Sequence, residues 1–319
     1  MSVLATVIVP TVTPARASAL LGSLSPSGGR FETLVVDNGT ASSELERAVV
    51  ALDGAEVMRV KSNLGYGRAV NLAARRAEGD VLVLLNDDCV VEERFVDRIA
   101  GALDPRAGAV MAAGVMLDAA DPALIDTAGM ELDRTLLVFD YLNGEPVAAL
   151  DRGVPDPVGP SGAAAAISRQ AFLEAGGFDE ALFAYWEDVD LVLRLRRMGG
   201  ICRLAADARG THHHSATLGS GSERKNFLIG FGRGYVLRKW SVLAPRRLPA
   251  VLARELALSA GQAIVDRNLG GAQGRLRGLR AARRSEPYPS PAVLGVPPSL
   301  ASTLRRRWRR RARLRDRAE

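Results

Sequence analysis

The first 113 residues alternate between short apolar runs and segments with helical spacing, and this alternation restricts the possible folds most strongly. Five apolar runs have the length of buried strands: residues 6–10, 33–37, 56–60, 80–85 and 109–113. Four segments between them have helical spacing: residues 15–24, 43–52, 66–77 and 92–103. Such alternation indicates parallel strands covered by helices. Right-handed crossovers then predict a doubly wound α/β half of the nucleotide-binding type.

Three of the predicted strands have a polar cluster at, or just after, their carboxyl end. They are Asp37-Asn38-Gly39, Asn63-Leu64-Gly65 and Asn86-Asp87-Asp88. Ligands of open α/β sheets bind outside the carboxyl ends of the strands. The three clusters are therefore expected to border one binding site.

The rest of the chain has a different pattern. Residues 114–160 predict a loop-rich insertion with a hairpin, and 163–168 and 201–205 predict further strands. Helices are expected at 170–175, 187–198, 222–240, 248–269 and 275–284. The predicted organisation is a catalytic domain over 1–240, divided at 113/114 into a nucleotide-binding half and an acceptor half. A helical appendage over 241–284 and a Pro-rich linker with an Arg-rich tail over 285–319 complete it.

The positive charge of the chain is confined to its end. The formal net charge is +6, but residues 305–319 hold nine Arg against Asp316 and Glu319, which leaves −1 for residues 1–304. A nucleic-acid-binding body is not expected, because its basic face would be spread through the fold. The arginines from Arg305 to Arg317 suit an anionic membrane surface, and a solvated terminus is the equally weighted alternative.

The cysteine content predicts a reducing compartment, and the hydropathy argues against a signal peptide and a membrane-spanning helix. Cys89 and Cys202 are the only cysteines, so no disulfide framework is implied. The first ten residues lack a basic segment before their apolar stretch and predict a strand instead of a signal peptide. The apolar stretch 248–265 is interrupted by Arg254 and Glu255, so a membrane-spanning helix is not expected. A cytoplasmic location, with possible attachment to the inner face of the membrane, is predicted.

Asn86-Asp87-Asp88, directly after the apolar run 81–85, is the strongest sign of chemistry. Hard oxygen ligands at the end of a strand suit Mg²⁺ or Mn²⁺, and such a cation can neutralise a leaving nucleoside diphosphate. The alternative is that Asp88 caps the helix predicted from Glu92.

A second acidic cluster, Glu187-Asp188-Val189-Asp190, opens a predicted helix after Tyr185-Trp186. A carboxylate here can act as the general base that deprotonates an acceptor hydroxyl, and Trp186 can form an apolar wall. Favourable interaction with the helix dipole is the competing explanation.

Two weaker signals complete the set. All three histidines are adjacent, at His212-His213-His214, and a neutral imidazole can bind a divalent metal. An exposed loop is the alternative for two of them. The glycine-containing segment from Asn63 to Arg68 leads into a helix, whose start favours anions.

Taken in order, these motifs resemble the family 2 glycosyltransferases of the GT-A fold, especially the bacterial rhamnosyl- and galactofuranosyltransferase-like enzymes of cell-envelope glycans. The likeness covers roughly residues 4–240. The motifs that carry it are Val7-Ile8-Val9-Pro10, Val35-Val36-Asp37-Asn38-Gly39, Asn63-Leu64-Gly65-Tyr66-Gly67 through Asn71, Leu84-Leu85-Asn86-Asp87-Asp88, Gly162 to Arg169, Gly176-Gly177-Phe178-Asp179-Glu180, Phe183 through Leu191, and His212 through Thr217.

The resemblance implies a role for each matching position. Asp88 and His212 would bind Mg²⁺ or Mn²⁺, and Asp188, with Glu187 beside it, would be the base of an inverting transfer. Trp186 and Gly162 would border the acceptor. The residues implied to bind the nucleotide sugar are Pro10, Asp37, Asn38, Gly65, Asn71, Asn86 and Asp87. The implied donor is a nucleoside-diphosphate sugar, and the implied acceptor is a glycan or a lipid-linked glycan.

The sequence departs from the family pattern in two places, and other functions stay open. Asn86 replaces the first Asp of the family's metal motif, and Pro10 leads into a short loop, Thr11-Val12-Thr13. One alternative is a non-catalytic nucleotide-sugar-binding or scaffold protein of the same fold. The other is a nucleotidyltransferase, for which Arg16 is the only early basic candidate.

Overall fold

The structure is a computed structural model that describes residues 5–24, 31–50, 52–212, 221–243 and 248–291. A central sheet contains the strands β1 (Ala5–Thr11), β2 (Phe31–Asn38), β3 (Ala55–Val60), β4 (Val81–Leu85), β5 (Cys89–Val91), β6 (Ala109–Asp118), β7 (Asp121–Thr127), β10 (Ala164–Ser168) and β11 (Ile201–His212). The strand order is β3-β2-β1-β4-β10-β6-β11-β5, and β7 pairs with β6. Strands β8 (Met130–Leu132) and β9 (Val138–Asp140) form a separate hairpin.

The first half of the sheet is parallel and the second half is mixed. Strands β1, β2, β3 and β4 run parallel to one another, whereas β10 runs antiparallel to both β4 and β6. β11 is parallel to β6 and antiparallel to β5. The parallel, helix-covered sheet predicted for the first half of the chain is therefore confirmed.

Helices cover both faces of this sheet, which explains why its strands are continuously apolar. The helices α1 (Pro14–Ser23), α2 (Glu44–Val49) and α4 (Phe95–Gly101) pack on one face, where Val83 and Leu85 contribute to the core. The helices α3 (Tyr66–Arg76), α5 (Arg169–Glu174) and α6 (Glu187–Arg197) pack on the other, with Leu82 and Leu84. Alternate residues of β4 thus enter opposite cores, as the pleat of a strand requires.

Two strands extend beyond their predicted ends, and one was not predicted. β6 continues from Ala113 to Asp118 and then turns into β7, and β11 continues from Ala205 to His212. β5 occupies residues for which no helix or strand was predicted. Residues 114–160 contain this longer strand, β7, the β8–β9 hairpin and a 3₁₀ helix over Val147–Arg152, so they are more ordered than the sequence indicated.

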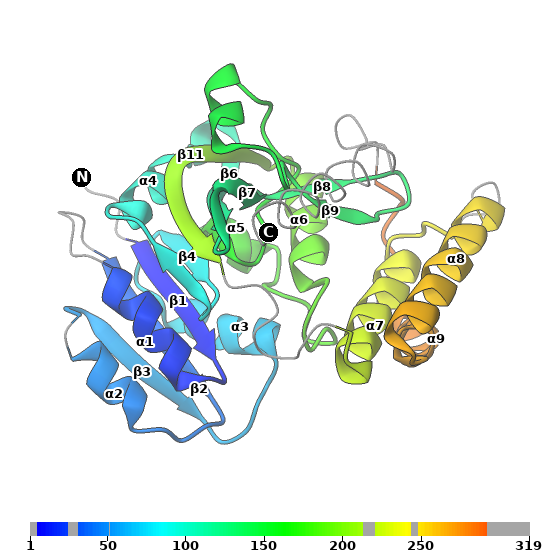
Figure 1. Ribbon diagram of the computed structural model, residues 1–319, viewed down its shortest axis with the longest axis horizontal. Helices are drawn as coiled ribbons and strands as arrows, with labels where there is room; N and C mark the ends of the chain where they lie inside the picture. The colour runs from blue at the N-terminus through cyan, green and yellow to red at the C-terminus, as the bar shows by residue number, and fades with distance from the viewer. Residues whose placement is uncertain (1–4, 25–30, 51, 213–220, 244–247, 292–319) are drawn as a thin grey trace, which may run out of the picture.

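Three helices follow the sheet region: α7 (Glu223–Lys239), α8 (Leu248–Asp266) and α9 (Gly270–Ala281). They form a group at one side of the molecule, with α8 at its outer edge (Figure 1). α7 and α9 approach very closely, because a Cβ on Gly274 would lie 2.1 Å from the carbonyl oxygen of Phe227. Only glycine permits this contact.

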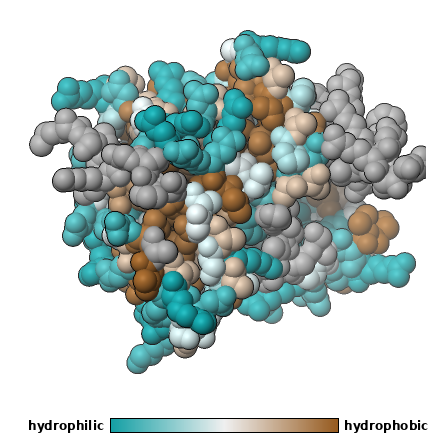
Figure 2. Space-filling view, turned by 60° about the vertical axis from the view of Figure 1, so that its left-hand side comes forward, coloured by the Kyte–Doolittle hydropathy of each residue, from teal (hydrophilic) through white to brown (hydrophobic). Residues whose placement is uncertain are grey.

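On the face of the molecule shown in Figure 2, hydrophilic residues lie around much of the edge and hydrophobic residues lie toward the middle. Of the described residues, only α8 forms a helix that is long and apolar enough to cross a membrane by length and composition. The arginine tail and His213 and His214 lie outside the described residues.

Candidate active site

A cavity of about 780 Å³ lies where the carboxyl ends of β1 and β4 meet the start of α6. Polar groups from distant parts of the chain converge on it. The residues proposed from the sequence that line it are Pro10, Asn38, Gly65, Asn86, Asp87, Asp88, Gly162, Trp186, Glu187, Asp188 and His212. The two acidic clusters, one hundred positions apart in sequence, therefore border the same space.

Pairing between two strands brings His212 to Asp88. In the antiparallel ladder between β5 and β11, His212 lies opposite Cys89, the residue after Asp88. Nε2 of His212 lies 3.2 Å from Oδ1 of Asp88. Asp88 is not the helix cap that was considered as an alternative, because it precedes β5 and the cap position of α4 is Arg94.

The opposite nitrogen of His212 contacts a second carboxylate. Nδ1 of His212 lies 3.0 Å from Oδ2 of Asp126, whose side chain is completely buried at the end of β7. Burial opposes a charge on His212, but the hydrogen bond with Asp126 and the nearby carboxylate of Asp88 outweigh it and raise the pKa of His212 to about 9. The metal-free protein therefore holds an imidazolium between two carboxylates at neutral pH.

These groups fit a divalent cation. Oδ1 of Asp88 is buried and, within the described part of the chain, contacts Nε2 of His212 without forming a hydrogen bond of good geometry. Adjacent ligands of an octahedral ion with bonds of about 2.1 Å are about 3 Å apart, close to the observed separation of 3.2 Å. Cys89 is nearby, but burial raises the pKa of its thiol, so Cys89 stays neutral. A neutral thiol is a poor ligand for Mg²⁺ or Mn²⁺.

The neighbouring residues at the strand ends are held by hydrogen bonds. Asp87 accepts a hydrogen bond of 2.6 Å from the hydroxyl of Thr11, and burial raises its pKa. Asn38 accepts from the backbone N–H of Leu64 at 2.8 Å and donates to the carbonyl of Gly65. Asn38 thus fixes the loop that contains Gly65. Gly65 has φ +84°, and a Cβ there would lie 2.3 Å from the carbonyl oxygen of Phe183.

The start of α6 is conformationally constrained. Tyr185 and Trp186 both have positive φ, at 67° and 75°, although neither is glycine. Such residues are uncommon and mark sites whose surroundings force the conformation. The guanidinium of Arg233 lies 5.2 Å from the ring of Trp186. This constraint aims Glu187 and Asp188 into the cavity.

Glu187 and Asp188 differ in their hydrogen bonding. Burial and the nearby Asp188 carboxylate raise the pKa of Glu187 to about 8, and its Oε2 has no partner among the described residues. Burial also raises the pKa of Asp188, but the N–H groups of Val189, at 2.8 Å, and Gly162, at 3.3 Å, oppose the shift. Backbone N–H groups therefore stabilise a negative charge on Asp188, whereas the surroundings of Glu187 favour its protonated form.

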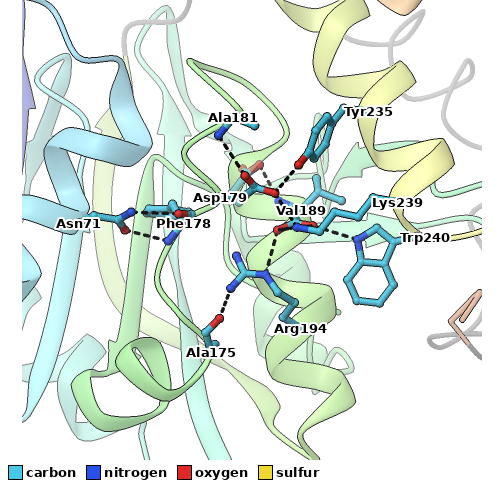
Figure 3. Close-up of polar contacts among 12 residues, drawn as sticks. Asn71, Ala175, Phe178, Asp179, Ala181, Val189, Arg194, Tyr235, Lys239 and Trp240 are labelled. Carbon is cyan, nitrogen blue, oxygen red and sulfur yellow. Dashed lines mark hydrogen bonds and ion pairs between the residues drawn. The ribbon is translucent and has the colours of Figure 1, made fainter. Parts of the chain in front are cut away.

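A buried polar network anchors α6 to α7 behind this pair (Figure 3). Asp190 is completely buried and accepts hydrogen bonds from Arg194 at 2.9 Å, Lys239 at 2.9 Å and the indole of Trp240 at 3.0 Å. Lys239 also donates to Asp179 at 2.7 Å. Asp190 therefore stabilises the packing of α6 against α7, whereas Asp188, two residues earlier, lines the cavity.

Two of the residues predicted to bind the nucleotide sugar do not line the cavity. Asp37 is completely buried and accepts hydrogen bonds from the N–H and hydroxyl of Thr40. Both halves of the Asn71 amide are engaged by the backbone of Phe178, at 2.8 and 2.9 Å (Figure 3). Both side chains thus lie outside the cavity lining in this structure, and their contact with a donor stays a prediction.

Several cavity residues were missed from the sequence. Tyr66 donates a hydrogen bond of 3.2 Å to the carbonyl of Gly162, and Arg224 and Lys225 line the cavity from α7. Asp126 lies just behind the cavity wall, in contact with His212. No local motif marked these positions, because strand register and helix packing bring them to the site.

Comparison with known proteins agrees with this geometry. Residues 6–120 match the family described as Glycosyl transferase family 2. The chain is 29% identical over 231 residues to an N-acetylglucosaminyl-diphospho-decaprenol L-rhamnosyltransferase of Mycobacterium tuberculosis, covering 62% of this chain and 72% of that protein. It is 28% identical over 202 residues to the O-antigen biosynthesis protein RfbC of Myxococcus xanthus, covering 59% of this chain and 15% of RfbC.

Solved structures share the fold. A mannosyltransferase, PcManGT from Pyrobaculum calidifontis, in complex with GDP-Man and Mn²⁺ superposes with a TM-score of 0.54 at 16% identity, covering 89% of this chain and 88% of its own. GalNAc-T7 with UDP, GalNAc and Mn²⁺ gives a TM-score of 0.57 at 16% identity, covering 90% of this chain. The chain spans 55% of the length of that structure. Residues 6–120 thus match a family 2 glycosyltransferase domain, and the chain is similar to glycosyltransferases of this family and shares the GT-A fold.

Proposed function

We propose that this protein is an inverting, divalent-cation-dependent glycosyltransferase that moves a sugar from a nucleoside-diphosphate donor to an acceptor hydroxyl. The observation that carries the proposal is the placement of Asp88 with His212 and of Asp188 on the walls of one cavity. One group would supply cation ligands and the other a carboxylate base. An inverting displacement needs these two functions on either side of the reacting sugar.

Asp88 and His212 would hold Mg²⁺ or Mn²⁺, which supplies charge neutralisation to the leaving diphosphate. Asp126 would keep the proton of the metal-bound imidazole on Nδ1, which leaves the Nε2 lone pair for the metal. Asn86 and Asp87 border the same end of the cavity. We assign the donor diphosphate to this end, with the nucleoside toward Pro10 and Asn38.

Asp188 would take the proton of the acceptor hydroxyl as this oxygen attacks the anomeric carbon. The backbone N–H groups that stabilise its charge, and its orientation held by the N–H of Gly162, suit a general base. Glu187 in its neutral form can donate a hydrogen bond to a sugar or acceptor oxygen. Alignment of donor and acceptor between the two clusters would supply much of the rate enhancement.

The names of the relatives support a cell-envelope glycan as the product. One relative acts on a diphospho-decaprenol-linked sugar and another belongs to O-antigen biosynthesis. We therefore propose a lipid-linked glycan acceptor and a site of action at the cytoplasmic face of a membrane. Arg224 and Lys225 at the cavity wall would face the acidic groups of such an acceptor. The division into a nucleotide-binding half, 1–113, and an acceptor half, 114–240, stays a prediction.

A donor panel tests this function. UDP-, dTDP- and GDP-linked sugars are incubated with the protein and Mn²⁺ or Mg²⁺, and released nucleoside diphosphate is measured with and without acceptor. Cation-dependent release from one donor class is expected, and chelation should abolish it. Release of pyrophosphate would instead indicate nucleotidyl transfer, and binding without turnover would indicate the non-catalytic alternative.

A further inference from the structure

Helix α8 has its polar and apolar sides reversed relative to an ordinary surface helix. Its charged and amide side chains point toward the protein: Arg254 pairs with Asp133, and Glu255 accepts from Arg233 at 2.6 Å. Gln262 and Asp266 hydrogen-bond to Asn226 of α7, at 2.8 and 2.9 Å. The polar face of α8 is thus its inward face.

Every exposed residue between positions 249 and 265 is apolar or glycine. These residues are Pro249, Ala250, Leu252, Ala253, Leu256, Ala257, Ala260, Gly261, Ile264 and Val265. Leu256, Ile264 and Val265 are 70%, 76% and 79% exposed. Soluble surface helices place apolar residues toward the core and charged residues outward. A continuous apolar strip on the outside therefore marks a surface that another apolar phase covers.

The helices around this strip are strongly basic. Residues 223–286 contain 14 Lys and Arg against four Asp and Glu. Seven of these arginines are exposed among the described residues, against two glutamates, Glu223 and Glu286. The exposed arginines are Arg224, Arg238, Arg267, Arg277, Arg280, Arg283 and Arg284. An apolar face with basic flanks is the pattern of a helix that lies in the interface of an anionic membrane.

We propose that α8 docks the protein on an anionic membrane by lying in the plane of the interface, with Leu252, Leu256, Ile264 and Val265 in the acyl boundary. This inference does not depend on the proposed reaction. The charge of the surroundings argues against a second copy of the chain as the occupant, because a symmetric contact would bring two strongly basic helix groups together.

An in-plane position agrees better with the contacts of α8 than a membrane-spanning one. The pair between Glu255 and Arg233 is buried, and Arg275 contacts the same carboxylate at 3.0 Å. A spanning helix would have to break these pairs or bring their charges into hydrocarbon, which is costly. The inward contacts therefore hold α8 against α7 and α9 while its outer side faces lipid.

The position of α8 also relates the membrane to the cavity. α7 carries Arg224, Lys225 and Ile229 on the cavity wall, and its Asn226 bonds to α8. One turn of α7 thus connects the cavity to the membrane-facing helix. A lipid-linked substrate in the bilayer would reach the cavity over a short path.

The experiment places an environment-sensitive fluorophore on α8 of the full-length chain. In Leu256→Cys, the new thiol is the accessible one, because Cys89 and Cys202 are buried. The matched control is Val50→Cys. Position 50 follows α2, is 84% exposed and lies in another part of the fold than α8. Vesicles contain phosphatidylcholine with or without phosphatidylglycerol, and nitroxide-labelled lipids serve as quenchers.

With anionic vesicles, the probe at position 256 should shift to shorter wavelength and be quenched by the nitroxide lipids, whereas the probe at position 50 should not respond. The double variant Leu256→Asp/Ile264→Asp should lower the vesicle-bound fraction at least about tenfold, because two apolar anchors become charged. Far-UV circular dichroism checks that it is folded.

Three results would overturn the proposal: an unresponsive probe at position 256, unchanged binding of the double variant, or a wild-type dimer that the double variant dissociates in sedimentation analysis. Unchanged binding would assign attachment to other basic segments of the chain. A dissociated dimer would assign the apolar strip to a second copy.

Discussion

The carboxylate of Asp126 lies 3.0 Å from Nδ1 of His212, and the other ring nitrogen of this histidine lies 3.2 Å from Asp88. Asp126 of β7, His212 of β11 and Asp88 in the turn before β5 thus form a line from the buried end of β7 to the cavity. Asp126 fixes which nitrogen of His212 faces Asp88. Histidines that bind metals usually have such a partner on the opposite nitrogen.

Asp126→Asn should weaken Mn²⁺ binding by about 10- to 100-fold, because loss of an outer-shell partner has this effect on metal affinity. The measurement is a titration of free Mn²⁺ by electron paramagnetic resonance with the otherwise unmodified protein. Asp156→Asn is the control, since it makes the same charge change at a half-exposed pair with Arg203 outside the cavity. Equal affinities of Asp126→Asn and wild type would show that Asp126 does not orient a ligand.

Mn²⁺ affinity should rise with pH. The metal-free protein holds a proton on His212 with a pKa of about 9, and the cation must displace this proton to bind Nε2. Below this pKa, each pH unit should change the affinity by up to about tenfold. Titrations at pH 6.5, 7.5 and 8.5 test this dependence. His212→Gln should flatten it, and an equally steep profile in that variant would attribute the proton to another group.

Glu187→Gln should increase stability at neutral and alkaline pH. The fold raises the pKa of Glu187 from 4.5 to about 8, so the folded state keeps a proton that the unfolded state has lost. The free energy of unfolding of the wild type should therefore fall as pH rises from about 4.5 to 8. Glutamine has the shape of the protonated acid without its titration. The difference in melting temperature between variant and wild type should grow over this window and then stay constant; a difference independent of pH would contradict the assignment.

Asp190→Ala should destabilise the protein by about 3–5 kcal/mol, because it leaves buried Arg194 and Lys239 without their shared carboxylate. Urea unfolding measures the loss. Glu56→Ala is the matched control, since its pair with Arg76 is solvent-exposed and should contribute far less. Similar losses in both variants would mean that the buried network does not anchor α6.

Local sequence patterns predicted most of the fold, because strands buried between two helical layers and helices that end at Gly or Pro have strong local signals. The strands from Ala5 to Leu85 and the helix from Glu187 lie within two residues of their predicted positions. The predictions for 114–160 were weakest. β7 is set by its pairing with β6, and no local pattern encodes that register.

The residues of the site also divide into those with local sequence signals and those that depend on tertiary contacts. Asp88, Asp188 and His212 were predicted because they follow or open strong elements and match family motifs, and all three line the cavity. Asp126 was missed because its role depends on tertiary contact with a residue 86 positions away. Asp37 and Asn71 were predicted to border the nucleotide, and in this structure their carboxylate and amide groups bond to Thr40 and Phe178. Sequence position alone does not distinguish a polar group that faces a ligand from one that supports a loop.

The most direct test measures the contributions of the two acidic clusters separately. Binding of nucleoside diphosphate in the presence of Mn²⁺ is measured by calorimetry for the wild type, Asp88→Asn and Asp188→Asn, together with sugar transfer from the donor found in the panel. Asp188→Asn should retain Mn²⁺-dependent binding and lose about 10²- to 10⁴-fold in transfer, the usual contribution of a general base. Asp88→Asn should lose the Mn²⁺-dependent binding itself. Full transfer activity of Asp188→Asn, or unchanged binding by Asp88→Asn, would contradict the proposed division of roles.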